Sequence, residues 1–182
     1  MSGVRSPLAP PKILKMKESI SLIGMAGAGK STLGSRLAKY LGYKFIDSDL
    51  LIEASHKKSL QEILNENGIK SFREIEEKNL LSINFNNTVL ATGGSAIFSQ
   101  QAMEHIRKES ILIYIETTYE DIINRVKDFS QRGFIKESHQ TIEEAFLERQ
   151  SLYKDYADFV ITNDSSIDEC FDKIVEIVNQ NR

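Results

Sequence analysis

The sequence predicts an α/β fold of three layers, in which helices cover both faces of a parallel sheet. Short apolar runs alternate with segments of helical periodicity along the 182-residue chain, which is the pattern of parallel strands joined by right-handed crossovers. The run at residues 111–115 is almost continuously apolar, as expected of a strand that is covered on both faces. A glycine-rich segment, GMAGAGKST at residues 24–32, joins the first strand to the first helix.

Five strands and their connecting helices can be placed in order. Strands are predicted at residues 20–23, 45–46, 89–91, 111–115 and 159–161. Helices are predicted at residues 32–41, from about 50, from 59 to near 68, at 71–81 and 100–108, from 118 to about 127, from 141 to about 155, and from near Ser166 onward. Two of them begin with capping boxes, SLQE at 59–62 and TIEE at 141–144.

Composition and charge narrow the class of protein. A net charge of −3 with dispersed lysines and arginines argues against nucleic acid as the main partner, and no apolar run approaches membrane-spanning length. Cys170, the single cysteine, has helical spacing to Ile167 and Ile174 and is expected to be buried. Without a second cysteine or a secretory signal, we expect a cytoplasmic setting. We also expect a monomer. Residues 1–17, which hold all three prolines, are expected to be a disordered extension of a single domain at 18–182.

The glycine-rich segment matches the phosphate-binding P-loop pattern G-x-x-x-x-G-K-S in the context that this motif requires. Glycines allow backbone N–H groups to approach phosphate oxygens, and the loop opens a helix whose N-terminus favours anions. Lys30 can reach the β- and γ-phosphates, and the Ser31 hydroxyl can bind Mg²⁺. The alternative is an ordinary flexible turn between a strand and a helix.

Three polar segments directly follow predicted strands: the P-loop, Asp47-Ser48-Asp49 and Gly93-Gly94. Ligands of open parallel sheets gather beyond the carboxyl ends of the strands, so these segments should meet at one edge. Of the two acids, one can serve the metal and the other the acceptor hydroxyl. The alternative is that Asp47 or Asp49 only caps the following helix.

The arginines are ambiguous when taken singly. Arg73 and Glu76 share a helix face and could form a surface ion pair. Arg149 and Tyr153, four residues apart, carry no clear signal alone. Arg132 lies in the segment with the weakest periodicity, where it is either a solvated charge or part of a mobile loop that stabilises a transferring phosphoryl group.

Taken together, these motifs resemble the shikimate kinase family. GAGKST at residues 27–32, FIDSD at 45–49, FREIE at 72–76, Gly93-Gly94 and R-x-x-x-Y at 149–153 occur in the order and spacing of that family. The resemblance covers nearly all of the chain after residue 18. It implies the fold of the nucleoside monophosphate kinase-like P-loop enzymes, with strand order 2-3-1-4-5 and a mobile lid at about 129–140.

The resemblance also implies a role for each matching residue, with ATP and Mg²⁺ as cofactors. The nucleotide would contact Gly27, Ala28, Gly29, Lys30, Ser31, Thr32, Arg125, Arg132 and Asn163. Mg²⁺ would be held by Ser31 and, through water, by Asp47. The acceptor, a carboxylated polyol, would contact Asp49, Arg73, Gly93, Gly94 and Arg149. Lys30, Asp47, Asp49 and Arg132 would be the catalytic residues.

The implied activity is transfer of the γ-phosphoryl group of ATP to a hydroxyl of shikimate, a step of chorismate and aromatic amino acid biosynthesis. Two departures from the family pattern keep alternatives open. Ser95 stands where the family usually has a third glycine, and Gly133 stands where it has proline after the lid arginine. The alternatives are a kinase for another hydroxylated acid, such as a gluconate-like sugar acid, and a nucleotide-binding regulator that has lost transfer activity.

Overall fold

The computed structural model describes residues 17–126, 134–136, 139–164 and 166–181. Its strands are β1 (Ser19–Ile23), β2 (Lys44–Asp47), β3 (Thr88–Ala91), β4 (Ser110–Glu116) and β5 (Phe159–Thr162). Its helices are α1 (Lys30–Leu41), α2 (Ser48–His56), α3 (Leu60–Leu81), the short 3₁₀ helix η1 (Ala96–Phe98), α4 (Gln100–Glu109), α5 (Tyr119–Arg125), α6 (Ile142–Tyr156) and α7 (Ile167–Gln180). The predicted extension, apart from Lys17, lies outside the described residues.

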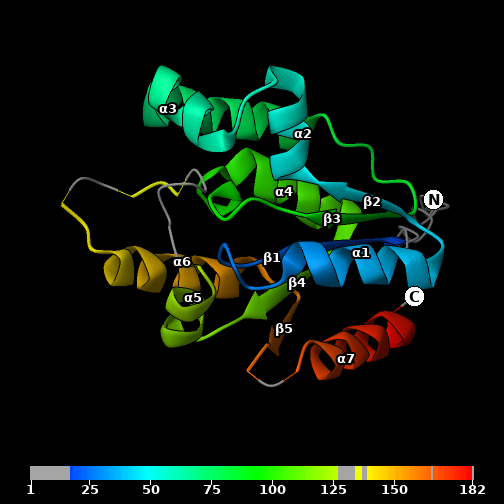
Figure 1. The fold of residues 1–182 in the computed structure, drawn as a ribbon. Coiled ribbons are helices and arrows are strands. Elements are labelled where there is room, and N and C mark those ends of the chain that lie inside the picture. Colours follow the sequence, from blue (N-terminus) through cyan, green and yellow to red (C-terminus); the bar gives the residue numbers. More distant parts are fainter. Residues whose placement is uncertain (1–16, 127–133, 137–138, 165, 182) are drawn as a thin grey trace, which may run out of the picture.

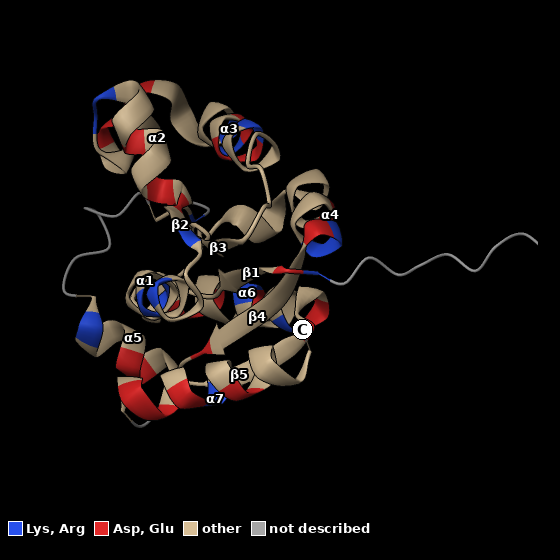
Figure 2. Ribbon diagram, turned by 90° about the vertical axis from the view of Figure 1, so that its right-hand side faces the viewer, with Lys and Arg blue, Asp and Glu red and all other residues tan. Residues whose placement is uncertain are grey.

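The five strands form one parallel sheet in the order β2-β3-β1-β4-β5, which confirms the predicted architecture. Helices α1 and α7 pack together against one face, and α4 and α6 cover the other (Figures 1 and 2). The coloured ribbon in Figure 2 also shows acidic and basic residues on helices on both sides of the sheet. No helix in the described part of the chain has the length and apolar character needed to span a bilayer.

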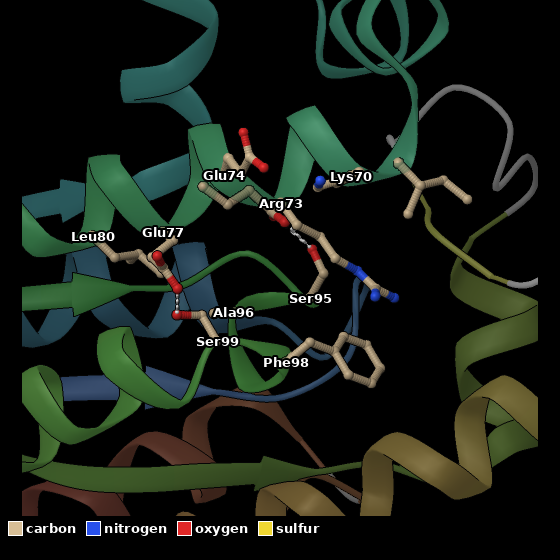
Figure 3. Close-up of a pocket in the computed structure, with 11 residues that line it drawn as sticks. Lys70, Arg73, Glu74, Glu77, Leu80, Ser95, Ala96, Phe98 and Ser99 are labelled. Carbon is tan, nitrogen blue, oxygen red and sulfur yellow. Dashed lines mark hydrogen bonds between the residues drawn. The ribbon is translucent and has the colours of Figure 1, made fainter.

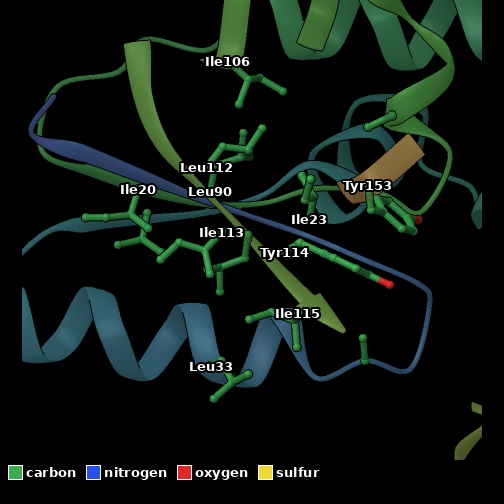
Figure 4. Packing of buried hydrophobic residues seen from close by; sticks show 14 of the residues in the cluster. Ile20, Ile23, Leu33, Leu90, Ile106, Leu112, Ile113, Tyr114, Ile115 and Tyr153 are labelled. Carbon is green, nitrogen blue, oxygen red and sulfur yellow. The ribbon is translucent and has the colours of Figure 1, made fainter. Parts of the chain in front are cut away.

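Alternation along β4 shows how both faces of the sheet are filled (Figure 4). Ile113 and Ile115 lie on the side of Leu33 in α1, whereas Leu112 lies on the side of α4. Tyr114 stacks on Tyr153 of α6, with ring centroids 5.0 Å apart. All of these side chains are buried. Because helices cover both faces of the sheet, both sets of alternating residues in β4 are apolar, and the strand is a continuous apolar run in the sequence.

Two helix boundaries can be compared with the sequence-based prediction. Residues 59–68 and 71–81 were expected to form two helices, and α3 consists of two helical segments joined at a kink, where Gly68 has a non-helical backbone with a φ of 74°. Glycine marks a break in helical geometry here without ending the helix. Helix α2 begins at Ser48, because Asp47 caps it through hydrogen bonds from the backbone N–H groups of Asp49 and Leu50. Cys170 is buried in α7, as expected.

Candidate functional site

The carboxyl edge of the sheet carries a cavity of about 440 Å³ between the P-loop and the end of β2. Most of the predicted nucleotide residues border it. The lining includes Gly27, Gly29, Lys30, Ser31, Thr32, Asp47, Asp49, Gly94 and Arg125. Segments that are far apart in the sequence therefore meet at one edge, as parallel strands require.

The P-loop backbone depends on its glycines at two positions. Gly27 has a φ of 85°, and a Cβ there would lie 2.6 Å from Cγ2 of Val126. Gly29 has a φ of 95° and is the N-terminal cap of α1. A Cβ on Gly29 would lie 3.2 Å from the amide nitrogen of Asn163. The left-handed backbone and the close neighbours both favour glycine, and the loop borders the cavity at the N-terminus of α1, where backbone N–H groups have no partner within the helix.

Lys30 lies across the inside of the loop. Its side chain is buried at 7% exposure, and its Nζ donates hydrogen bonds to the carbonyl oxygens of Gly24 (2.8 Å) and Met25 (2.7 Å). These two hydrogen bonds hold the ammonium group of Lys30 at the wall of the cavity. A phosphate anion is the ligand chemistry that this cradle of N–H groups and one ammonium fits.

Asp47 uses its two carboxylate oxygens for different purposes. One oxygen accepts from the N–H groups of Asp49 (3.1 Å) and Leu50 (3.4 Å) and so caps α2. The other accepts a hydrogen bond from the Ser31 hydroxyl at 2.6 Å. A hydroxyl and a carboxylate oxygen side by side fit Mg²⁺, which prefers oxygen ligands and usually keeps several waters. Capping and a place in the site are therefore combined in one residue.

A second, smaller cavity of about 30 Å³ adjoins the first one and shares Asp49 and Gly94 with it. Its lining includes Ser95 of the turn after β3, Phe134, Ile135 and Arg149. The Tyr153 hydroxyl donates to the carbonyl oxygen of Gly94 at 2.6 Å. Burial raises the pKa of Tyr153, which keeps this hydroxyl protonated as a donor. The tyrosine of the R-x-x-x-Y motif therefore anchors the Gly93-Gly94 turn.

Two guanidinium groups stack on the same aromatic ring. Arg73 lies 4.8 Å and Arg149 lies 5.2 Å from the centroid of Phe98, and Arg149 also lies 4.5 Å from that of Phe134. Arg149 is 2% exposed and donates to the carbonyl oxygens of Ala145 and Ile135. Burial lowers its pKa. The Nε of Arg73 is buried and has no hydrogen-bond partner among the described residues.

The alternative of an Arg73–Glu76 surface ion pair is wrong. Glu76 is buried at 7% exposure, and the Ser95 hydroxyl lies 2.5 and 2.6 Å from its two carboxyl oxygens. Within the described ranges, Arg73 forms no ion pair. Arg73 instead borders a neighbouring cavity of about 390 Å³ between α3 and η1, which Glu76, Ser95 and Phe98 also line (Figure 3).

The remaining predicted residues differ in how directly they meet the site. Asn163 is buried and its amide donates to the carbonyl oxygen of Ala28 at 2.9 Å, so it supports the P-loop from behind. Arg125 borders the larger cavity and donates to the carbonyl oxygen of Asn163. Arg132 lies outside the described residues, as does most of the predicted lid at 129–140. Residues 134–136 of that segment are described, and Ile135 packs against Leu60 and Phe72.

Sequence reasoning placed Ser95 at the acceptor site, but it did not assign site roles to Glu76, Phe98 or Ile135. Phe98 and Ile135 carry no motif signal, because their roles come from packing between separate elements. Glu76 falls within the FREIE segment, but its partner is a serine on another element. A buried acid next to a glycine turn can be recognised only when α3 and that turn are placed together.

Comparisons with known proteins identify close relatives of this arrangement. The family model for shikimate kinase matches residues 26–179. A shikimate kinase of Clostridium botulinum (strain Eklund 17B / Type B) is 36% identical over 167 residues, which cover 91% of this chain and 100% of the relative. The structure of shikimate kinase from Acinetobacter baumannii in complex with shikimate has a TM-score of 0.81 and 30% identity, and the match covers 95% of this chain and 99% of that one.

A more distant likeness concerns the fold alone. A gluconokinase from Sinorhizobium meliloti 1021 has a TM-score of 0.51 and 14% identity, and the match covers 91% of this chain and 93% of that one. At this level of identity, only the shared architecture can be concluded.

Proposed function

The chain belongs to the shikimate kinase family, and from this premise we propose that it transfers the γ-phosphoryl group of ATP to a hydroxyl of shikimate, giving shikimate 3-phosphate. The observation that carries this proposal is the sharing of Asp49 and Gly94 by the two cavities. A carboxylate and a glycine turn stand between the P-loop and the buried Arg149. An acceptor held by Arg149 would therefore present a hydroxyl to Asp49 next to the transferable phosphate.

The nucleotide side can be derived from the chain's own residues. P-loop N–H groups and the Lys30 ammonium would bind the β- and γ-phosphates, and Ser31 with Asp47 would hold Mg²⁺. When bound, the metal ion supplies charge neutralisation for the transferring group. Lys30 keeps its position through the two carbonyl groups of the loop, so little rearrangement is needed when phosphate arrives. Arg132, in the lid, would add positive charge.

The acceptor side combines a carboxylate clamp with a hydroxyl-binding acid. Paired guanidinium groups suit a planar carboxylate, and the buried, unpartnered Nε of Arg73 provides a donor for it. In the structure, Arg149 donates a hydrogen bond to the carbonyl oxygen of Ile135. An incoming carboxylate would replace this carbonyl oxygen as the acceptor. Asp49 would orient the acceptor hydroxyl and accept its proton late in an in-line transfer. The 30 Å³ cavity requires Phe134 and Ile135 to move before an acceptor enters.

The alternative acceptors receive less support. A gluconate-like acceptor was suggested by Ser95, but the hydroxyl of that residue is engaged with Glu76. A regulator without transfer activity is disfavoured by the joint presence of Lys30, Ser31, Asp47 and Asp49 at one cavity. Cytoplasmic location, a monomeric state and the Mg²⁺ requirement remain parts of this proposal.

An acceptor panel tests the proposal. ADP release from Mg²⁺-ATP would be followed with shikimate and with gluconate, for the wild-type chain and for Asp49→Ala. We expect turnover with shikimate, none with gluconate, and a loss of at least about 100-fold in kcat/KM for the variant. Turnover of gluconate without turnover of shikimate would overturn the assignment of the acceptor.

A further inference from the structure

Ser95 and Glu76 form a buried hydrogen-bonded pair between the turn after β3 and helix α3 (Figure 3). The pair borders both the 30 Å³ acceptor cavity and the neighbouring 390 Å³ cavity, so it is part of the wall between them. A Cβ built on Gly93 would lie 2.5 Å from an oxygen of Asp49 and 3.2 Å from an oxygen of Glu76. The two carboxyl groups thus approach the same glycine from α2 and from α3.

The geometry of the pair points to a proton on Glu76. The Ser95 hydroxyl lies 2.5 Å from one carboxyl oxygen and 2.6 Å from the other. A hydroxyl group carries a single proton, so it can donate fully to only one of the two oxygens. Ser95 therefore leaves one oxygen of a buried carboxyl group without a full donor, and no ion pair to Glu76 is found within the described ranges, so an ionised carboxylate there would be poorly compensated.

The surroundings of Glu76 favour the same protonation state. The pKa of Glu76 is raised to about 8, chiefly by burial and in smaller part by the nearby Asp49, although the Ser95 hydrogen bond acts in the lowering direction. Arg73 of the same helix and Arg149 of α6 act in the lowering direction. Tyr153 of α6 also faces this group, and it remains neutral. At neutral pH the wall of the acceptor cavity therefore carries a neutral acid, Glu76, close to Asp49.

We propose that Glu76, held in place by Ser95, is a positioning residue for the acceptor: buried in the wall of the acceptor cavity, it carries a proton at neutral pH, and loss of that proton weakens the binding of an acceptor that carries a carboxylate. This inference rests on the proposed function, because it concerns the same acceptor site. Ionised Glu76 competes with the acceptor carboxylate for Arg73 and Arg149, and it repels that carboxylate. The proton released from Glu76 goes to solvent.

A pH series of steady-state kinetics tests the pair. KM for shikimate and KM for Mg²⁺-ATP would be measured from about pH 6.5 to about pH 9.5. In the wild-type chain we expect KM for shikimate to rise by at least about fivefold above pH 8, while KM for ATP stays level. Glu76→Gln should abolish this rise, because an amide does not titrate. Ser95→Ala should move the rise to higher pH, because it removes the hydrogen bond that lowers the pKa.

The adjacent residue offers a matched control. Glu77 also accepts a hydrogen bond from a serine, Ser99, at 2.5 Å, between the same helix and the segment that follows η1. Glu77 does not line the acceptor cavity. Glu77→Gln should therefore keep the pH profile of the wild-type chain. If Glu76 had only a structural role, Glu76→Gln would change the free energy of unfolding, but KM for shikimate would still rise with pH as it does in the wild-type chain.

The outcomes separate this inference from the proposed function. If the wild-type chain does not phosphorylate shikimate at neutral pH, the proposed function fails and this inference fails with it. If it does, and KM for shikimate is flat with pH or rises equally in Glu76→Gln, only the inference is overturned. Carbon-13 NMR of the Glu76 carboxyl group gives an acceptor-free reading in the wild-type chain: titration near pH 8 supports the pair, and titration below about pH 6 overturns it.

Discussion

Asp47 illustrates how one residue can serve both the fold and the site. Its position at the end of β2 places one oxygen on the first N–H groups of α2 and the other on the Ser31 hydroxyl. The two functions need different properties, because a cap requires only an acceptor oxygen, whereas a metal site requires negative charge. Substitutions can therefore separate them.

Asp47→Asn and Asp47→Ala should differ in stability but agree in activity. The amide oxygen of asparagine can still cap α2, so we expect an unchanged free energy of unfolding, whereas alanine should lose about 1 kcal/mol. Both variants should need at least about tenfold more Mg²⁺ for half-maximal activity. Urea denaturation and a Mg²⁺ titration of the rate measure the two effects. Equal Mg²⁺ requirements in the wild-type chain and both variants would remove Asp47 from the metal site.

Glu76 should make the stability of the native chain depend on pH. Its pKa is about 8 in the folded chain against an ordinary value of 4.5, so between these values the native state holds a proton that the unfolded state releases. The stabilisation linked to this proton is complete below about pH 4.5 and is lost as pH rises through 8. The loss from this single residue can reach roughly 5 kcal/mol.

Chemical denaturation at several pH values measures this linkage. The free energy of unfolding of the wild-type chain should fall relative to that of Glu76→Gln as pH rises from about 5 to about 8. Parallel pH curves for the two proteins would show that Glu76 does not titrate in this window.

At the scale of elements, the turn between β3 and η1 contacts the two helices, α2 and α6, that contribute residues to the acceptor cavity. Helix α6 contributes Arg149 and Tyr153, which lie four residues apart and so share one face. Tyr153 holds the turn through the carbonyl oxygen of Gly94, while Arg149 faces the cavity. Helix α2 brings Asp49 to the other side of the same turn. The turn therefore has little room for a side chain at Gly93.

Gly93→Ala should damage acceptor handling and leave the nucleotide side intact. The added Cβ would lie 2.5 Å from an Asp49 oxygen, so the carboxylate must move. We expect kcat/KM for shikimate to fall by at least about tenfold while KM for ATP changes by less than about twofold. Gly42→Ala is the control, because its Cβ would meet nothing within 4 Å and its φ of 69° adds backbone strain only. Equal kinetics of the two variants would contradict the role given to the turn.

At the scale of the whole molecule, the site depends on two apolar clusters, a large one around the sheet and a small one that includes Leu60, Phe72 and Ile135 beside the acceptor cavity. One apolar cluster joins the sheet to the helices on both faces, so distant residues reach the rim only in the folded chain. A ligand that binds the native state alone stabilises it by mass action, by about 2.7 kcal/mol at a concentration 100-fold above Kd.

Mg²⁺-ATP should therefore raise the Tm of the wild-type chain by roughly 5–11 °C at that excess. Lys30→Ala should lose most of this shift, because its ammonium group lies at the phosphate cradle. Lys39→Ala, at an exposed position near the end of the same helix, should retain it. Thermal unfolding with and without nucleotide measures all three proteins. An undiminished shift in Lys30→Ala would contradict the assignment of Lys30.

The parts of the fold and site that local patterns determine could be predicted from the sequence. Strand ends, the P-loop, Asp47 and Asp49 follow from short motifs and from the rule that parallel strands end at one edge. The strand order came from the family resemblance. What depends on contacts between distant elements was missed, such as the Ser95–Glu76 pair, the ring of Phe98 under two arginines and the position of Ile135. Gly68 shows that a local signal can suffice, because its left-handed, non-helical backbone interrupts α3 where the sequence predicted one helix to end.

The central claim is that the P-loop and the carboxylate clamp meet at one rim and transfer phosphate to shikimate. Phosphorus-31 NMR of the wild-type chain with Mg²⁺-ATP and shikimate tests this most directly. We predict that ADP and a new phosphomonoester signal appear in equal amounts, at a rate that Arg149→Ala reduces at subsaturating shikimate. ADP accompanied only by inorganic phosphate, or no reaction at all, would contradict the account.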